Sequence, residues 1–104
     1  MSLILIVEDN EKNLKLARDL LEVKGYRTAT AGSGEDGIRV AQERHPDAIL
    51  MDIQLPGISG IEALRRLRAD PATAAIPVIA ITASVMDQDR AQIIAAGFDG
   101  YVAK

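Results

Sequence analysis

The hydrophobic residues of the chain form three short, nearly continuous runs, with longer amphipathic stretches between them. The runs cover residues 3–7, 48–51 and 78–81 and consist mostly of Ile, Leu and Val. Runs of this length and composition are typical of strands that helices cover on both faces. Weaker strands are predicted around Thr28 and Tyr101. The pattern therefore predicts five strands.

The first two amphipathic stretches carry clear start and stop signals for helices. Asn10 can cap a helix that runs to Lys24, and Gly25 can end it. Ser33 can cap a second helix, which must end before Pro46 because a proline disfavours helical backbone in the residue before it. Two helices are therefore expected between the first three strands.

Two further helices are predicted in the second half of the chain. Ser59 and Glu62 have the spacing of a capping box, and a fourth helix is expected over 87–96, stopped by Gly97. The residues predicted to point inward are Leu14, Ala17 and Leu21 in the first helix and Ile61, Leu64 and Leu67 in the third.

Strands and helices thus alternate along the whole chain, with short loops between them. Parallel neighbours in a sheet need crossover connections, so this alternation predicts an α/β fold with a doubly wound, five-stranded parallel sheet. The flavodoxin-like strand order 2-1-3-4-5 is expected, which places a ligand site between the first and third strands. We expect residues 1–104 to form one domain.

Composition and charge narrow the class of protein. The 104 residues are 48% hydrophobic, and 12 basic against 15 acidic residues leave a net charge of -3. No stripe of Lys or Arg could neutralise phosphates along a duplex, so no direct nucleic-acid partner is expected. The chain has no cysteine, and its first apolar run is too short for a signal peptide or a membrane span. We expect a soluble, cytoplasmic domain without a membrane partner.

Carboxylates occupy the predicted ends of two neighbouring strands. Glu8 and Asp9 follow the first strand, and Asp52 follows the third. Like charges at short range raise each other's pKa or require a cation, and a site of carboxylates, a carbonyl and waters suits Mg²⁺. Asp47 precedes the third strand, so at roughly 3.3 Å per residue it should lie about 16 Å from Asp52 and take no part.

Two later strand ends add a hydroxyl and a cation to the same edge. Thr82 follows the fourth predicted strand, and Lys104 follows the fifth. Acid cluster, metal, hydroxyl and lysine together describe a place where a phosphoryl group could be attached to a carboxylate. Asp52 would then follow an apolar run because the third strand places it at this edge of the sheet. The turn at Pro56 and Gly57 would keep the edge open.

With these positions the sequence resembles the receiver domain of two-component response regulators over essentially its whole length. The similarity runs from "LILIVEDN" through "LMDIQLPGISG" and "IPVIAITA" to "GYVAK". The segments "VEDNEKN", "MDIQLP" and "TASVM" are most similar to DivK-type single-domain regulators or to the receivers of hybrid histidine kinases. Thr82 stands thirty residues after Asp52, and Lys104 twenty-two after Thr82, as the resemblance requires.

The resemblance implies a role for each site residue. Asp52 would be the phosphoacceptor, taking a phosphoryl group from a phosphohistidine on a histidine kinase or a histidine phosphotransfer protein. The implied Mg²⁺ ligands are Asp9, Asp52 and the backbone carbonyl of Gln54, with Glu8 acting through water. Thr82 and Lys104 would hold the phosphoryl oxygens, and Tyr101 would change rotamer when Thr82 moves, which would switch contacts with a downstream protein. The domain would catalyse its own phosphorylation and dephosphorylation without being an independent enzyme.

Two other functions remain open at this level. A Mg²⁺-dependent phosphohydrolase can use a strand-end Asp, but it usually needs a second acid two residues later, where this chain has Gln54. A phosphorylation-independent interaction module could keep the same fold.

Receivers also normally continue past this lysine with a proline and a fifth helix, so we expect a chain that is truncated at its C-terminal end and a surface open to dimerisation.

Overall fold

Helices and strands alternate throughout the computed structural model, which describes residues 2–82 and 87–103. In chain order the elements are β1 (Leu3–Val7), α1 (Glu11–Val23), β2 (Arg27–Ala31), α2 (Gly34–Arg44), β3 (Ala48–Asp52), α3 (Gly60–Ala69), β4 (Val78–Thr82), α4 (Asp87–Ala96) and β5 (Gly100–Ala103). The predicted order is confirmed. The third and fourth strands are one residue longer than predicted, so that Asp52 and Thr82 are the last residues of β3 and β4.

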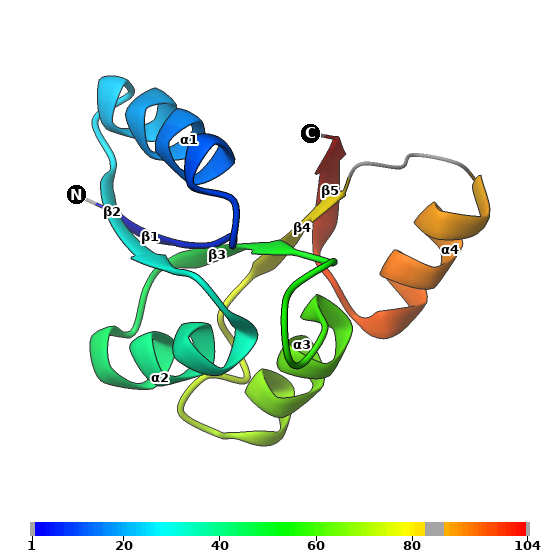
Figure 1. Cartoon of the computed structure of the whole chain (residues 1–104). Coiled ribbons are helices and arrows are strands. Elements are labelled where there is room, and N and C mark those ends of the chain that lie inside the picture. The colour runs from blue at the N-terminus through cyan, green and yellow to red at the C-terminus, as the bar shows by residue number, and fades with distance from the viewer. Residues whose placement is uncertain (1, 83–86, 104) are drawn as a thin grey trace.

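The five strands form one parallel sheet in the order β2-β1-β3-β4-β5, which confirms the predicted flavodoxin-like arrangement. Helix α1 lies on one face of the sheet, whereas α2 and α3 lie on the other (Figure 1). Helix α4 lies beside β5, at the far end of the sheet from β2 (Figure 1). Because all strands are parallel, their carboxyl ends meet at a single edge.

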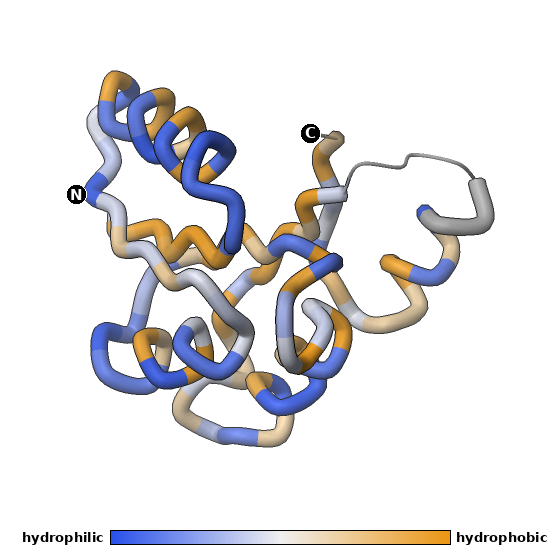
Figure 2. The backbone as a smooth tube through the Cα atoms, in the orientation of Figure 1, coloured by the Kyte–Doolittle hydropathy of each residue, from blue (hydrophilic) through white to orange (hydrophobic). Residues whose placement is uncertain are grey.

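The hydrophobic core follows the central strands. All five residues of β1 are buried, and Ile49 and Met51 of β3 and Val78 of β4 are fully buried as well. In the edge strand β2 only Ala29 and Ala31 are buried, and this strand is paler in the hydropathy colouring (Figure 2). The continuous apolar runs therefore became inner strands, as their pattern predicts.

The helix starts confirm the predicted caps. The side chain of Asn10 accepts a hydrogen bond from the backbone N–H of Asn13 at 3.1 Å, and the hydroxyl of Ser33 accepts one from that of Asp36 at 3.2 Å. Helix α1 ends where the sequence places its stop, since Gly25 adopts φ 94°. Only glycine takes up this left-handed backbone without a steric penalty.

Two predictions for α3 are wrong in detail. Ile61 is 39% exposed instead of inward-facing, because it lies about 100° around the helix from Gly60, which shares the buried face with Leu64 and Leu67. Only half of the capping box forms. Ser59 accepts from the N–H of Glu62 at 3.2 Å, but the Glu62 carboxylate binds Arg65 and Arg66, whose hydrogen bonds lower its pKa.

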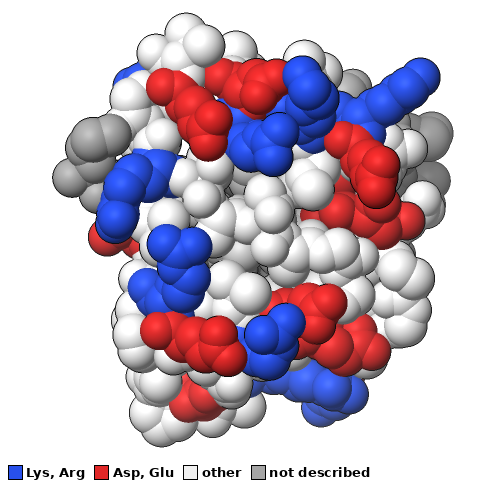
Figure 3. Space-filling view, turned by 60° about the vertical axis from the view of Figure 1, so that its left-hand side comes forward, with Lys and Arg blue, Asp and Glu red and all other residues white. Residues whose placement is uncertain are grey.

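Acidic and basic side chains are mixed on the side of the molecule where β2 lies between α1 and α2 (Figure 1). Figure 3 shows side chains of both signs at the top and bottom of this side, around an uncharged area in the centre of the view. Ion pairs within each helix, such as Lys15 with Asp19 at 3.0 Å and Arg39 with Asp36 at 3.3 Å, account for the mixing. This face therefore has no patch of one sign. Among the described residues, no helix is both long and apolar enough to cross a membrane.

Arg68 connects several segments at the edge of the sheet where the strands begin, opposite their carboxyl ends. Its guanidinium donates hydrogen bonds to the carbonyl oxygens of Ala74 and Ile76, at 3.0 and 2.6 Å, and to the Asp99 carboxylate at 2.8 Å. The same Asp99 oxygen accepts the backbone N–H of Val78 at 2.8 Å. One side chain thus joins the end of α3, the following loop and the starts of β4 and β5.

Replacing Arg68 by Met should lower the free energy of unfolding by about 1–3 kcal/mol, because three acceptors lose a charged donor. Urea unfolding measures the change. Arg65→Met is the matched control. Arg65 is 78% exposed, and among the described residues its side chain pairs only with Glu62 on its own helix, so the expected loss is below about 0.5 kcal/mol. Equal losses in the two variants would contradict the role of Arg68.

Candidate functional site

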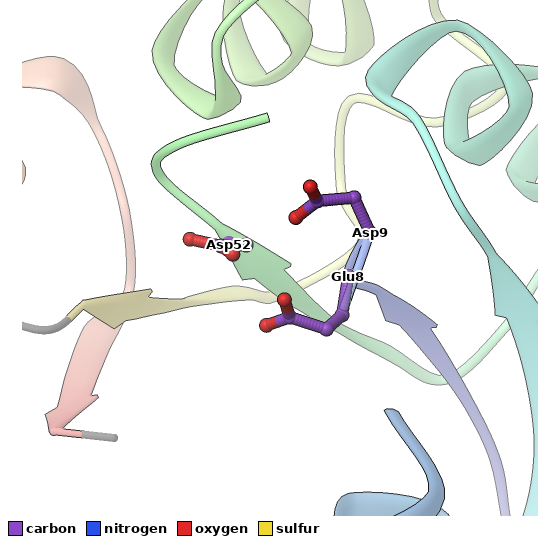
Figure 4. Close-up of side chains that lie close together, drawn as sticks. All are labelled: Glu8, Asp9 and Asp52. Atoms are coloured by element: carbon purple, nitrogen blue, oxygen red, sulfur yellow. The ribbon is translucent and has the colours of Figure 1, made fainter. Parts of the chain in front are cut away.

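Three carboxylates converge at the carboxyl ends of β1 and β3. Glu8 and Asp9 directly follow β1, and Asp52 ends β3. Val7 is in register with Met51, so the two strands deliver the residues that follow at the same level. One oxygen of each carboxylate lies within 4.8 Å of the others, and all three side chains project beyond the strand ends (Figure 4). The sequence prediction of a convergent acid cluster is confirmed.

Two of the three carboxylates are buried. Glu8 and Asp52 are each 2% exposed, whereas Asp9 is exposed. The backbone N–H of Asn10 donates to Oε1 of Glu8 at 3.1 Å, and that of Gln54 donates to Oδ1 of Asp52 at 3.0 Å. These hydrogen bonds orient the two buried carboxylates.

The chemistry of this donor set suits a hard cation. Carboxylate oxygens at close range repel each other, and burial makes that repulsion stronger than it is in water. Hard divalent ions prefer oxygen ligands, and the cluster contains no histidine or cysteine. Glu8, Asp9 and Asp52 therefore fit a divalent metal ion, with Asp9 on the side that solvent can reach.

The turn after β3 brings the chain back close to the end of that strand. Gly57 adopts φ 74°, a backbone conformation that glycine allows, and the chain then folds back to begin α3. The backbone N–H of Gly60 donates to the carbonyl oxygen of Ile53 at 2.9 Å. A Cβ atom at Gly60 would overlap the carbonyl oxygen of Asp52, so the close return of the chain requires glycine there. The turn therefore packs against the backbone of Asp52 and Ile53.

The other predicted site residues lie at or near the same edge. Thr82 ends β4 and is buried, and Ile81 just before it is in register with Asp52 on the neighbouring strand. Gln54 is exposed in the turn after β3. Tyr101 is half-buried on β5, packed against the hydrophobic core. Lys104 lies outside the described residues, so its predicted place in the site stays a prediction.

Asp47 lies at the opposite edge of the sheet, as predicted. Its carboxylate accepts the backbone N–H of Leu3 at 2.7 Å, and its own N–H donates to the Leu3 carbonyl oxygen at 2.8 Å. It thus fastens the start of β1 and does not belong to the acid cluster.

An apolar groove of about 390 Å³ lies on the α1 face of the sheet. Leu16 and Leu20 of α1 form one wall, at 70% and 59% exposure, and Leu50, Ile81 and Val102 are among the strand residues that line it. Glu8 also lines the groove and joins it to the acid cluster. Exposed apolar side chains are therefore present on this face, and the predicted dimerisation through such a surface stays a prediction.

One contact near the site has no signal in the sequence. The guanidinium carbon of Arg90 on α4 lies 5.6 Å from the centroid of the Tyr101 ring on β5. Hydrophobic periodicity and capping patterns concern residues of one element. A pair that joins a helix to the next strand depends on how the two elements pack, which those patterns do not contain.

Comparisons with known proteins agree on one family. The family model described as response regulator receiver domain matches residues 4–104. The polar-differentiation response regulator DivK of Brucella ovis is 48% identical over 101 residues, which are 97% of this chain and 82% of the relative.

The similar solved structures are receiver domains as well. The N-terminal domain of a response regulator receiver protein from Methanoculleus marisnigri JR1 superposes with a TM-score of 0.92 at 34% identity, over 100% of this chain and 85% of that one. The receiver domain of the sensor histidine kinase PA1611 from Pseudomonas aeruginosa PAO1 gives 0.91 at 38%, over 99% and 84%. The latter structure is described as having a magnesium ion coordinated in the active site cleft.

Asp9→Asn should raise the free energy of unfolding by up to about 1 kcal/mol in metal-free buffer of low ionic strength, because one of three repelling charges is removed. The gain should shrink with added salt, which screens an exposed charge. Asp47→Asn is the matched control and should instead lower that free energy by about 0.5–1 kcal/mol, since it weakens the bond to Leu3. Urea unfolding of Asp9→Asn without any gain at low salt would show that the repulsion is not significant.

Proposed function

This chain belongs to the response regulator receiver domain family, and we propose that it is the phosphoacceptor domain of a two-component phosphorelay, with Asp52 as the residue that is phosphorylated. The observation that carries the proposal is the place of Asp52: a buried carboxylate at the end of an inner strand, beside two further carboxylates. A purely structural acid would have no need of such neighbours, whose repulsion costs stability.

Mg²⁺ is the metal that we propose for the acid cluster. Asp9, Asp52 and the backbone carbonyl of Gln54 would hold it directly, and Glu8 would act through water. The ion would supply positive charge against which phosphoryl oxygens can approach a carboxylate. The support comes from the oxygen-only donor set, from family membership and from the magnesium in the related kinase receiver.

The proposed reaction is an in-line transfer from a phosphohistidine. A carboxylate oxygen of Asp52 forms a bond to phosphorus while the nitrogen–phosphorus bond of the donor breaks, and the imidazole nitrogen keeps the electron pair of that bond. The Gln54 N–H restrains the Asp52 carboxylate, so the nucleophile is oriented before the donor arrives. Water attack on phosphorus at the same site would later restore the carboxylate. The domain thus promotes its own phosphorylation and dephosphorylation, but we do not propose an independent enzyme.

The remaining site residues would bind the charged phosphoryl oxygens and pass the change on to the protein surface. Thr82, at the end of the strand next to β3, would donate its hydroxyl to a phosphoryl oxygen, and Lys104 would neutralise another. Movement of Thr82 toward the phosphoryl group would then let Tyr101 change rotamer. This chain of events is the switch that would change the contacts with a downstream protein.

A histidine kinase or a histidine phosphotransfer protein would supply the phosphoryl group, and a protein target would read the switch. The family membership of the chain implies partners of these two classes. A cytoplasmic location, with neither nucleic acid nor membrane as a direct partner, is part of the same proposal. We also propose that the apolar groove beside α1 can mediate association of two copies, because exposed apolar residues such as Leu16 and Leu20 gain from burial.

Incubation with acetyl phosphate and Mg²⁺ should add one phosphoryl group to the protein, because a small acyl phosphate can replace the histidine donor. Intact mass spectrometry measures the gain. It should vanish in Asp52→Asn and without Mg²⁺, and persist in Asp47→Asn, which makes the same change at the opposite edge. A gain that survives in a folded Asp52→Asn protein would refute the phosphoacceptor.

Mg²⁺ should also stabilise the folded protein, because it binds the native acid cluster and not the unfolded chain. At ten times its Kd the expected increase in the free energy of unfolding is about 1.4 kcal/mol. The increase should be largely lost in Asp9→Asn and retained in Asp47→Asn, as urea unfolding with and without MgCl₂ at constant ionic strength would measure. An undiminished increase in Asp9→Asn would exclude Asp9 as a ligand.

A further inference from the structure

The Tyr101 ring has a charged neighbour on the helix beside it. The Arg90 guanidinium lies 5.6 Å from the ring centroid, within the range of a cation–π interaction. Arg90 is exposed, whereas Tyr101 is half-buried and packs against the hydrophobic core. The guanidinium therefore contacts the tyrosine ring from the solvent side, while the ring also packs against the hydrophobic core.

The strand register shows which of those neighbours matter. Tyr101 is paired with Ala80 on β4, so its side chain shares a face of the sheet with Ala80 and, two residues further on, with Thr82. Ile81 and Val102 lie on the opposite face and line the apolar groove there. Diagonal neighbours of this kind are within reach of an aromatic side chain.

The residue opposite Tyr101 on β4 has a small side chain. Ala80 is completely buried, and it presents only a methyl group opposite the tyrosine. A methyl group obstructs a tilt of the ring toward Thr82 less than a larger side chain at this position would. What opposes such a tilt is any interaction that favours the present position of the ring, and the contact with Arg90 is one.

We propose that Arg90 is a positioning residue for Tyr101: its guanidinium holds the ring in the half-buried position and opposes movement of the ring toward Thr82. This inference rests on the proposed switch and deepens it. Arg90 sets how far the domain is biased toward its resting form. A cation–π contact at an exposed site corresponds to an about two- to fivefold change in the ratio of the two ring positions.

Fluorine NMR of protein labelled with 3-fluorotyrosine tests this directly. The chain has two tyrosines, so Tyr101 gives one resonance and Tyr26 an internal reference. The variant Arg90→Met keeps an apolar stem and loses the cation. In the unphosphorylated protein it should move the Tyr101 resonance toward the position that wild type reaches with saturating beryllofluoride and Mg²⁺, a phosphoryl analogue. Arg90→Lys keeps the charge without the planar guanidinium and should move it less.

Arg66→Met is the control, because Arg66 is an exposed arginine that pairs with Glu62 on α3. It should leave the Tyr101 resonance in place. A Tyr101 resonance that is unmoved in Arg90→Met, or that moves away from the beryllofluoride position, would overturn the role of Arg90. If acetyl phosphate labels Asp52 but beryllofluoride leaves Tyr101 unmoved in wild type, the inference fails while the phosphoacceptor function stands. If no phosphoryl group is added to Asp52 at all, the proposed function fails, and the inference fails with it.

Discussion

Electrostatic repulsion among three carboxylates is the constraint on which the rest of this structure depends. Glu8, Asp9 and Asp52 lie within 4.8 Å of one another, and two of them are almost completely removed from solvent. Asp52 ends β3, and Glu8 and Asp9 directly follow β1, so two inner strands of the parallel sheet set the positions of all three carboxylates. The hydrophobic burial and the hydrogen bonds of these strands hold the carboxylates close together in spite of their charge.

The edge of the sheet where the strands begin contributes to stability, whereas the edge at their carboxyl ends carries the candidate functional site. At the edge opposite the acid cluster, charged groups are paired: Asp47 accepts the N–H of Leu3, and Arg68 joins Asp99 to two loop carbonyls. At the edge with the cluster, three carboxylates lie within 4.8 Å of one another. The paired charges hold the starts of the strands, whereas the carboxylates at the carboxyl ends form a set of oxygen donors that fits a divalent cation.

The two faces of the sheet give the site two different surroundings. On the face shared with α4, Thr82 and Tyr101 lie on neighbouring strands, and Arg90 adds a charged contact to the ring. On the face shared with α1, the apolar groove reaches Glu8. Chemistry at the strand ends can therefore affect either face, because alternate residues of one strand point to opposite sides.

The sequence by itself determined the parts that depend on local order. Apolar runs, caps and glycines predicted every strand and helix, and the rule that parallel strands end at one edge brought Glu8, Asp9 and Asp52 together. Contacts between elements were decided only by tertiary packing. The outward rotation of Ile61 and the ring contact of Arg90 both depend on how a helix is turned against its neighbours. That rotation is set by the whole core at once, and no window of sequence contains it.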